Sequence, residues 1–355
     1  MSSSQDQSLI NKVFSSDNTA GASPAVLQAM MDAGAGIQAP YGMDRHSEQV
    51  EQALADIFEC PVSVFFVATG TAANALALSV YTPPWGAVLC HQESHINVDE
   101  CGAPEFFTHG AKLVFVEGDD SKISPKVLAT MAAPNMADAH SVQTSVVSVT
   151  QTTETGSIYS LNELSEIGRI CKENGLKFHM DGARFANALV ALDCSPAAMT
   201  WQAGVDVLSF GTTKNGTLAA EAIVLFDQTS AQEMIWRRKR SGHLVSKMRL
   251  ISAQIGAYLK QDLWLDNARH ANAMALRLDQ GLRAIDGIDI QGDTRSNMFF
   301  CHMPSAMIKD LLAQGFYFYS DRWGKNIVRL VTNFSTQEVD VDHFIAAAKA
   351  LAEAG

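Results

Sequence analysis

The chain has 355 residues, of which 47% are hydrophobic and 18% charged, and its formal net charge is −12 at pH 7. This length allows two domains, and the apolar content excludes a disordered chain. The acidic charge argues against nucleic acid or an anionic membrane as a partner, and no apolar run reaches the roughly 18 residues that span a bilayer.

Residues 1–45 predict an irregular N-terminal arm with one short helix near Pro24–Asp32. An amphipathic helix follows, in which apolar residues recur at the i, i+3, i+4 spacing of one helix face. That face comprises Val50, Ala53, Leu54, Ile57 and Phe58.

Short apolar segments then alternate with helical patterns as far as residue 245. Ser160 and Glu163 predict a capping box at the start of one of these helices. Apolar strands that alternate with helices are typical of a mainly parallel sheet covered on both faces. We therefore expect a large α/β domain over residues 46–245, with strands at Ser63–Ala68, Val88–Cys90, Lys112–Val116, Ser145–Thr150, Leu176–Met180, Asp206–Phe210 and Ala222–Phe226.

After residue 245 the pattern changes. Long helices over residues 246–285 precede short strands at Met298–His302, Phe316–Tyr319 and Asn326–Asn333, and a closing helix begins at Thr336. This order predicts a smaller C-terminal α+β domain over residues 246–355.

The six cysteines are spread along the chain without a C-x-x-C pair, which predicts reduced thiols rather than a disulfide framework. No histidine or cysteine spacing typical of a metal site occurs, so we expect no metal. The first residues lack the basic and apolar regions of a signal peptide. Together these features predict a soluble, cytoplasmic protein.

An acid and a lysine follow two of the predicted strands. Asp181 comes directly after the apolar segment Leu176–Met180, and Lys214 lies in a short polar loop after Asp206–Phe210. Open α/β sheets bind their ligands at the carboxyl ends of their strands. Alone, Asp181 could be a helix cap and Lys214 a surface lysine. As a pair they are what pyridoxal 5'-phosphate (PLP) requires: an amine that forms a Schiff base and a carboxylate against the pyridinium nitrogen.

A possible phosphate site lies at Gly70 and Thr71, between the strand Ser63–Ala68 and a predicted helix. Glycine lets the backbone approach a ligand, and the N–H groups at a helix N-terminus suit a phosphate. The signal is weak by itself, because any strand-to-helix turn can contain these residues. The chain has no G-x-G-x-x-G or Walker motif, so nothing favours a dinucleotide or ATP.

Four segments make the whole chain resemble the L-threonine aldolase family of fold-type I PLP enzymes. They are Tyr41–Asp44, Cys101–Glu105, His179–Arg184 and Phe210–Lys214. The resemblance implies an aspartate aminotransferase-like large domain with a mainly parallel sheet and a smaller C-terminal domain. It also implies a homotetramer with sites at dimer interfaces, in which the Tyr41–His46 loop serves a neighbouring subunit.

The resemblance also assigns residues to the cofactor. Lys214 is the Schiff-base lysine, Asp181 pairs with the ring nitrogen, and Gly70, Thr71 and Arg184 complete the PLP site. His95 corresponds to a histidine that stacks on the ring, although a lone histidine is more often an ordinary satisfied polar residue. The same loop carries His91 and Glu100.

Substrate binding follows in the same way. The family holds the substrate carboxylate with arginines from both domains and a serine near the N-terminus, which match Arg184, Arg329 and Ser16. Arginine suits this task because its planar fork binds a carboxylate through two hydrogen bonds.

The implied activity is the cleavage of L-threonine, L-allo-threonine and other β-hydroxy-α-amino acids such as phenylserine to glycine and an aldehyde. His95, directly or through water, is the candidate base for the β-hydroxyl. Three alternatives stay open: a PLP-dependent β-eliminating lyase, an aldolase that prefers phenylserine, and a protein that binds PLP without chemistry.

Two segments depart from the better-known members of the family. Thr213–Gly216 reads Thr-Lys-Asn-Gly where those members have Ser-Lys-Gly. Gln151–Gly156 replaces a Thr-His-Asn-like loop whose histidine contributes to the site, so that Thr153 and Glu154 are offered instead. The second departure leaves the handling of the β-hydroxyl undecided.

Overall fold

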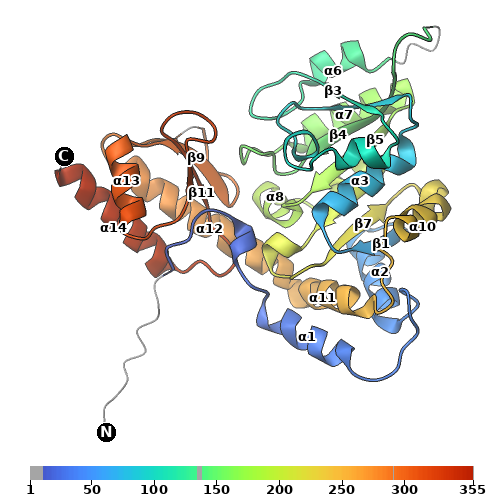
Figure 1. Cartoon of the computed structure of the whole chain (residues 1–355), viewed down its shortest axis with the longest axis horizontal. Coiled ribbons are helices and arrows are strands. Elements are labelled where there is room, and N and C mark those ends of the chain that lie inside the picture. The colour runs from blue at the N-terminus through green and yellow to red at the C-terminus, as the bar shows by residue number, and fades with distance from the viewer. Residues whose placement is uncertain (1–10, 134–137, 291, 355) are drawn as a thin grey trace. The chain divides into compact units, whose positions relative to one another are not determined.

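A computed structural model describes residues 11–133, 138–290 and 292–354 of the chain (Figure 1). The chain divides into two compact units: unit 1 joins Met1–Ala20 to Ala268–Gly355, and unit 2 spans Gly21–Asn267. This division lies later than the change of pattern at residue 245. The physical reason is that helix α11 (Arg249–Leu259) packs against α1 (Pro24–Gly34) and α2 (Arg45–Phe58), within unit 2.

Unit 2 contains a seven-stranded sheet in the order β1-β7-β6-β5-β4-β2-β3. All neighbouring strands are parallel except the pairs that β7 makes with β1 and β6. The mainly parallel α/β sheet expected from the sequence is therefore confirmed, with all seven strands near their predicted positions. They are β1 (Ser63–Val67), β2 (Gly86–Cys90), β3 (Lys112–Phe115), β4 (Gln143–Thr150), β5 (Lys177–Gly182), β6 (Val207–Gly211) and β7 (Glu221–Leu225).

The sheet buries side chains on both faces, as a parallel sheet must when helices cover it. On one face Val207 and Ile223 pack in a cluster with Leu76 of helix α3 (Gly70–Tyr81). On the other face the ring of Phe210 contacts those of Phe185 and Trp264. The remaining helices of this unit are α4 (His95–Val98), α5 (Ala103–Phe107), α6 (Pro125–Met131), α7 (Leu161–Asn174), α8 (Phe185–Leu192), α9 (Pro196–Met199) and α10 (Ala231–Arg240).

The predicted capping box at the start of α7 is confirmed. The Ser160 side chain accepts a hydrogen bond from the backbone N–H of Glu163, and the Glu163 carboxylate accepts one from the backbone N–H of Ser160. These bonds satisfy N–H groups that have no partner within the helix.

Unit 1 contains an antiparallel sheet in the order β10-β11-β9-β8. Its strands are β8 (Asp289–Ile290), β9 (Met298–His302), β10 (Tyr319–Ser320) and β11 (Ile327–Val331), and its helices include α13 (Ser305–Ala313) and α14 (Glu338–Ala354). Helix α12 (Leu263–Arg283) crosses the boundary between the units. β8 has no counterpart among the predicted strands, because its two residues are too few to form a pattern.

One sequence expectation shifts in detail. The strand expected at Phe316–Tyr319 forms only at Tyr319–Ser320, because the backbone of Tyr317 pairs with Lys12 and Phe14 instead of with β11. All six cysteines are free thiols. Within the described ranges, no helix has both the length and the apolar character needed to cross a bilayer.

Candidate active site

The carboxyl ends of three parallel strands meet at one edge of the large sheet. Asp181 on β5 pairs in register with Thr150 on β4 and with Ser209 on β6. β5 and β6 are direct neighbours, so Asp181 and the loop that carries Lys214 leave the sheet side by side. Gly211 permits this close approach, since a Cβ there would lie 2.6 Å from the Cα of Ala183.

Asp181 is buried, with 3% of its surface exposed. Its Oδ1 accepts a hydrogen bond from the backbone N–H of Ala183 at 3.0 Å, and its Oδ2 accepts one from Nδ2 of Asn74 at 2.9 Å. The residue that caps α8 is Arg184, not Asp181. The helix-cap alternative for Asp181 therefore loses its support, and a buried carboxylate held by neutral N–H donors remains.

Asn74 joins Asp181 to a second buried carboxylate. Its Nδ2 also donates to Oε1 of Glu100 at 2.8 Å, and the same Oε1 lies 2.8 Å from Nδ1 of His95. The side chain of Glu100 is fully buried, whereas that of His95 is 28% exposed. Asp181, Asn74, Glu100 and His95 thus form one hydrogen-bonded chain, which we call the acid–amide cluster.

The acid–amide cluster shifts the pKa of two of its members. Burial lowers the pKa of His95, but the hydrogen bond to Glu100 and the negative charges of Asp181 and Glu154 outweigh burial and the charge of Lys214, so the net shift is upward. Burial and the charge of Asp181 raise the pKa of Glu100 against the opposing bonds from His95 and Asn74. Each of the two groups therefore keeps its proton to a higher pH than the same side chain in water.

Sequence reasoning missed Asn74 and did not single out Glu100. In the sequence, Asn74 is an amide among the alanines and leucines of α3, and this contrast was the available signal. In the structure, its side chain is buried. Glu100 had a weaker signal, since it stands in a loop of several polar residues.

Lys214 lies in the one-turn 3-10 helix Thr213–Asn215 that follows β6, and it is half-buried. The neighbouring Asn215 anchors the turn: its Nδ2 donates to the hydroxyl of Tyr258 at 2.7 Å and to the carbonyl of Trp264 at 2.8 Å. The lysine therefore stands on a turn fixed by buried contacts, unlike an ordinary surface lysine.

Glu221 fixes the other side of this turn. It is buried, and its Oε2 accepts the backbone N–H of Thr212 at 2.7 Å. Burial raises the pKa of Glu221 to about 7, although the hydrogen bond from Thr212 and the positive charge of Lys214 oppose the rise.

Gly70 and Thr71, which the sequence offers for the phosphate, form the start of α3. The Thr69 side chain caps α3 by accepting the backbone N–H of Ala72 at 3.1 Å, while the first N–H groups of any helix lack partners within it. A Cβ built on Gly70 would meet nothing within 4 Å, so there is open space beside this helix end.

His179 stiffens the strand that carries Asp181. It is fully buried, and its two ring nitrogens contact the hydroxyls of Ser148 on β4 at 2.8 Å and Ser209 on β6 at 3.0 Å. Burial lowers the pKa of His179 to about 4. A neutral imidazole therefore ties together the three strands whose ends form the site.

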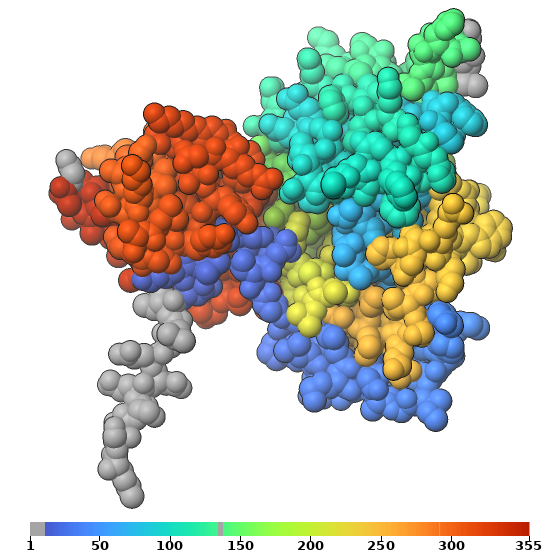
Figure 2. All heavy atoms as spheres, in the orientation of Figure 1, coloured from blue at the N-terminus to red at the C-terminus, as the bar shows by residue number. Residues whose placement is uncertain are grey.

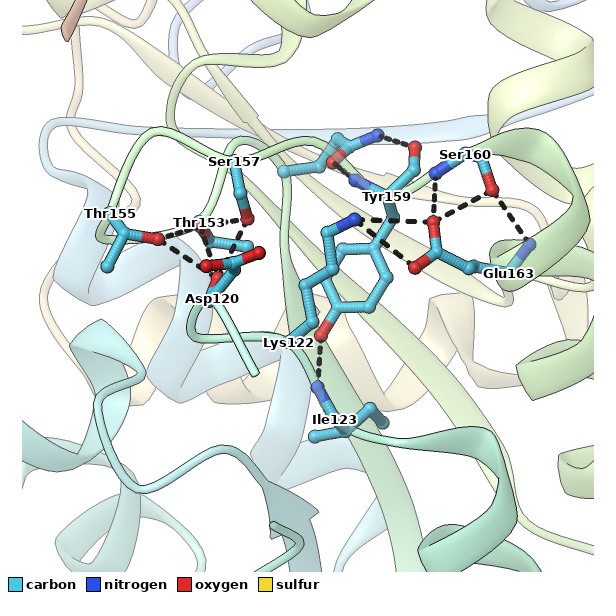
Figure 3. Close-up of polar contacts among 10 residues, drawn as sticks. Asp120, Lys122, Ile123, Thr153, Thr155, Ser157, Tyr159, Ser160 and Glu163 are labelled. Carbon is cyan, nitrogen blue, oxygen red and sulfur yellow. Dashed lines mark hydrogen bonds and ion pairs between the residues drawn. The ribbon is translucent and has the colours of Figure 1, made fainter. Parts of the chain in front are cut away.

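The hydroxyl groups of the loop Gln151–Ser157 hydrogen-bond to one another and to the backbone of Asp120. Figure 3 shows the side chains of Thr153, Thr155 and Ser157 converging on Asp120, whose carbonyl oxygen accepts from them at 3.2, 3.0 and 2.8 Å. The hydroxyl of Thr153 thus already has hydrogen-bond partners in Asp120 and Ser157. Of the two residues that the sequence offered for the β-hydroxyl, Glu154 is the half-buried one whose charge acts on His95.

The predicted carboxylate-binding residues fall in different units. Arg184 is buried in unit 2, at the start of α8. In unit 1, Nη2 of Arg329 donates to the backbone carbonyl of Ser15 at 3.1 Å, and its guanidinium lies over the ring of Trp323 at 4.8 Å. Ser16 caps a short 3-10 helix by accepting the N–H of Asn18 at 3.2 Å. Unit 1 therefore brings Arg329 to the segment that carries Ser16.

His95, Glu100 and Asp181 each offer a potential metal-ligand atom, and these atoms lie within 4.8 Å of one another. Among the described residues, the Asn74 amide already joins the two carboxylates, and His95 Nδ1 is turned to Glu100. We assign the three groups to hydrogen bonding within the acid–amide cluster.

Known proteins resemble the chain over nearly its full length. The beta-eliminating lyase family matches residues 14–304. The low specificity L-threonine aldolase of a Pseudomonas species is 38% identical over 96% of this chain and 98% of its own length. That of Pseudomonas aeruginosa is 40% identical over 86% of this chain and 88% of its own length.

A solved structure gives the same result for the fold. The threonine aldolase of Leishmania major superposes with a TM-score of 0.89 at 30% identity, covering 96% of this chain and 100% of that one. With its mainly parallel sheet and its candidate site at the carboxyl ends of β5 and β6, the chain belongs to the beta-eliminating lyase family and, within it, to the low-specificity L-threonine aldolases of fold-type I.

Proposed function

We propose that this protein is a PLP-dependent, low-specificity L-threonine aldolase. It splits L-threonine and L-allo-threonine, and other β-hydroxy-α-amino acids such as phenylserine, into glycine and an aldehyde. One observation carries the proposal: Asp181, His95 and the Lys214 turn share one sheet edge, in a chain 38% and 40% identical to two such aldolases.

The described residues fit PLP. The buried carboxylate of Asp181 has neutral N–H partners and suits a protonated ring nitrogen, while the open space at Gly70 and the start of α3 suit a phosphate. Lys214 supplies the amine for the cofactor's aldehyde, and His95 the ring that covers it. When bound, PLP supplies an electron sink for the bond broken at the substrate Cα.

The protein has to hold the substrate carboxylate and to remove the proton of the β-hydroxyl. We assign the substrate carboxylate to Arg184, Arg329 and Ser16, because a guanidinium binds a carboxylate bidentately. The base for the β-hydroxyl is His95, through Nε2, since Nδ1 is turned to Glu100. Fixing the carboxylate decides which bond at the Cα is broken, so that cleavage rather than decarboxylation follows.

The finer assembly is also a proposal. Large apolar side chains between residues 24 and 45 are exposed: Leu27, Met31, Ile37 and Met43. Figure 2 shows the start of unit 2, in the medium blue that follows the darkest blue of the chain, on the surface of that unit. We infer that this face is covered by another subunit of a homotetramer, with the Tyr41–His46 loop serving the neighbouring site. Six free thiols suit the reducing cytoplasm as its location.

The test is acetaldehyde release from L-threonine and L-allo-threonine, with the D-isomers and Lys214→Ala as controls. We expect release from the L-isomers that vanishes in the variant, and the ratio of the two rates gives the stereochemical preference. A yellow, PLP-loaded protein that releases no aldehyde would contradict the proposal.

A second candidate comes from the name of the matching family, beta-eliminating lyase. It uses the same lysine, aspartate and arginines, but releases pyruvate from serine-type substrates. Measuring pyruvate from L-serine beside glycine from L-threonine separates the two reactions, and the rate on phenylserine shows whether an aromatic aldehyde is preferred.

A further inference from the structure

The acid–amide cluster contains two residues to which the proposed reaction gives no direct role, Asn74 and Glu100. Both are almost completely buried at the carboxyl edge of the sheet. Burying a carboxylate is costly unless it is hydrogen-bonded, and Glu100 receives its two bonds on one oxygen only. Among the described residues, its Oε2 has no hydrogen-bond partner. A buried carboxylate with one unsatisfied oxygen is therefore expected to have a functional role.

We propose that Glu100 and Asn74 are positioning residues: Glu100 holds His95 with Nδ1–H turned away from the substrate, and Asn74 ties this pair to Asp181. The inference deepens the proposed function and rests on it for the identity of the base.

The charge of Glu100 sets the direction of its bond to His95. An ionised carboxylate oxygen can only accept, so Oε1 accepts from both the Asn74 amide and the ring, and Nδ1 carries the hydrogen. A histidine that donates Nδ1–H to a carboxylate keeps Nε2 as its proton acceptor, as in hydrolases where an aspartate orients the catalytic histidine. Glu100 thus selects the tautomer that a base requires.

The charge around His95 acts in the same direction. Glu100 and Asp181 face it from inside the site and Glu154 from the neighbouring loop, while Lys214 opposes them. The carboxylate of Asp99 lies 3.9 Å from Nε2, but it is 54% exposed and therefore screened by water. Among the acids of its own loop, Glu100 is the one that acts on His95 through a buried contact.

Asn74 donates both of its amide hydrogens, one to Glu100 and one to Asp181. The reverse orientation would place its carbonyl oxygen against two carboxylate oxygens, which is repulsive. Two carboxylates at this distance repel each other, and the amide lowers that cost without neutralising either charge. A positively charged cofactor ring beside Asp181 should therefore change the pKa of His95, because Asn74 and Glu100 connect the two residues.

The first test replaces the charge of Glu100 and keeps its shape, with Glu100→Gln. Slow hydrogen–deuterium exchange at histidine Cε1, resolved by peptide mass spectrometry in the full chain with and without PLP, reports the pKa of His95 without any turnover. We expect the pKa of His95 to fall by about one unit or more. The acidic limb of the kcat/KM profile should move to lower pH by the same amount, because the base stays deprotonated further down.

The matched control is Asp99→Asn, which removes one exposed charge from the same loop. We expect it to shift the pKa of His95 by less than about 0.3 unit. If Glu100→Gln leaves the pKa of His95 unchanged, or if Asp99→Asn moves it as far, Glu100 does not position His95. Because the exchange measurement needs no aldolase activity, that result is distinct from failure of the proposed function.

The second test addresses the coupling through Asn74. Asn74→Ala removes both bonds, and we expect PLP affinity, measured by absorbance titration, to weaken about tenfold or more. The dependence of the His95 pKa on bound PLP should shrink in the same variant. Unchanged PLP affinity together with an unchanged difference between loaded and unloaded protein would overturn the role of Asn74.

Discussion

The two ends of strand β5 carry charged groups that are arranged in opposite ways. At the amino end, Lys177 donates to Asp206 at 3.0 Å and to Asp227 at 2.7 Å, so that the charges pair directly. At the carboxyl end, Asp181 and Glu100 are joined by a neutral amide. Paired charges are typical of structural contacts. A buried carboxylate held by neutral donors, as Asp181 is, remains able to bind a cation, which is what a cofactor site needs.

A cavity by itself does not identify the functional end of β5. A cavity of about 560 Å³ lies at the amino end, where its lining includes Lys177, Asp206 and Trp201. Another of its lining residues, Arg169, is already paired, in this case with Glu173 on the same helix. The chemistry of the carboxyl end is the better guide, because it leaves reactive groups available.

The largest effect is expected at the carboxyl end, from Lys214→Ala. Without the amine the cofactor has no covalent anchor, and we expect kcat for L-threonine to fall by at least about 10³-fold. Steady-state acetaldehyde release measures it. Lys177→Met is the matched lysine change at the other end of the sheet, and its kcat should stay within about twofold of the parent's. Equal losses in both variants would remove the functional distinction between the two ends.

Asp181→Asn should have the next largest effect. The amide keeps the shape of the side chain but loses the charge that holds a ring nitrogen protonated, so we expect kcat to fall by about 10²-fold or more. Asp206→Asn at the amino end is the control, with kcat expected to change little. A full rate with Asp181→Asn, at saturating PLP, would show that this carboxylate does not tune the cofactor.

At the amino end we expect an effect on stability instead. Lys177→Met should lower the free energy of unfolding by about 1 kcal/mol, a modest figure because the lysine is partly exposed. Despite burial, the hydrogen bond to Lys177 holds the pKa of Asp227 below its usual value, and the hydrogen bond to Asp227 holds that of Lys177 above its own.

The sign of the pH dependence follows from these two shifts. The depressed pKa of Asp227 gives stability that is present near neutral pH and is lost as the pH falls through that pKa. The raised pKa of Lys177 gives stability that is lost only as the pH rises above it. Urea unfolding at pH 7 and below pH 4 should therefore show a difference between parent and variant that shrinks in acid. A difference that grows in acid would contradict the pairing.

The smallest effect is expected from Thr153→Val in the neighbouring loop. Its hydroxyl bonds to Asp120 and Ser157, so its loss should cost about 1 kcal/mol of stability and change kcat less than about threefold. Thermal unfolding and the L-threonine assay measure both. A large loss of kcat with unchanged stability would mean that Thr153 handles the β-hydroxyl after all.

The sequence predicted those parts of the site that depend on local pattern. Asp181 and Lys214 follow apolar strands directly, and neighbouring parallel strands bring their carboxyl ends together whatever the rest of the chain does. The fold class was predictable for the same reason. Asn74 and Glu100 were not, because their contacts join segments 26 and 107 residues apart and depend on how α3 packs against β5. The use of Thr153 within its loop likewise depends on Asp120, 33 residues earlier.

The most direct test of the account is to find which lysine holds the cofactor. The protein is loaded with PLP, reduced with borohydride to make the link permanent, digested, and mapped by mass spectrometry. We predict a pyridoxyl group on the peptide containing Lys214 and none on the peptide containing Lys177. A modified lysine elsewhere, with Lys214 unmodified in a yellow protein, would contradict the assignment of the site to the carboxyl ends of β5 and β6.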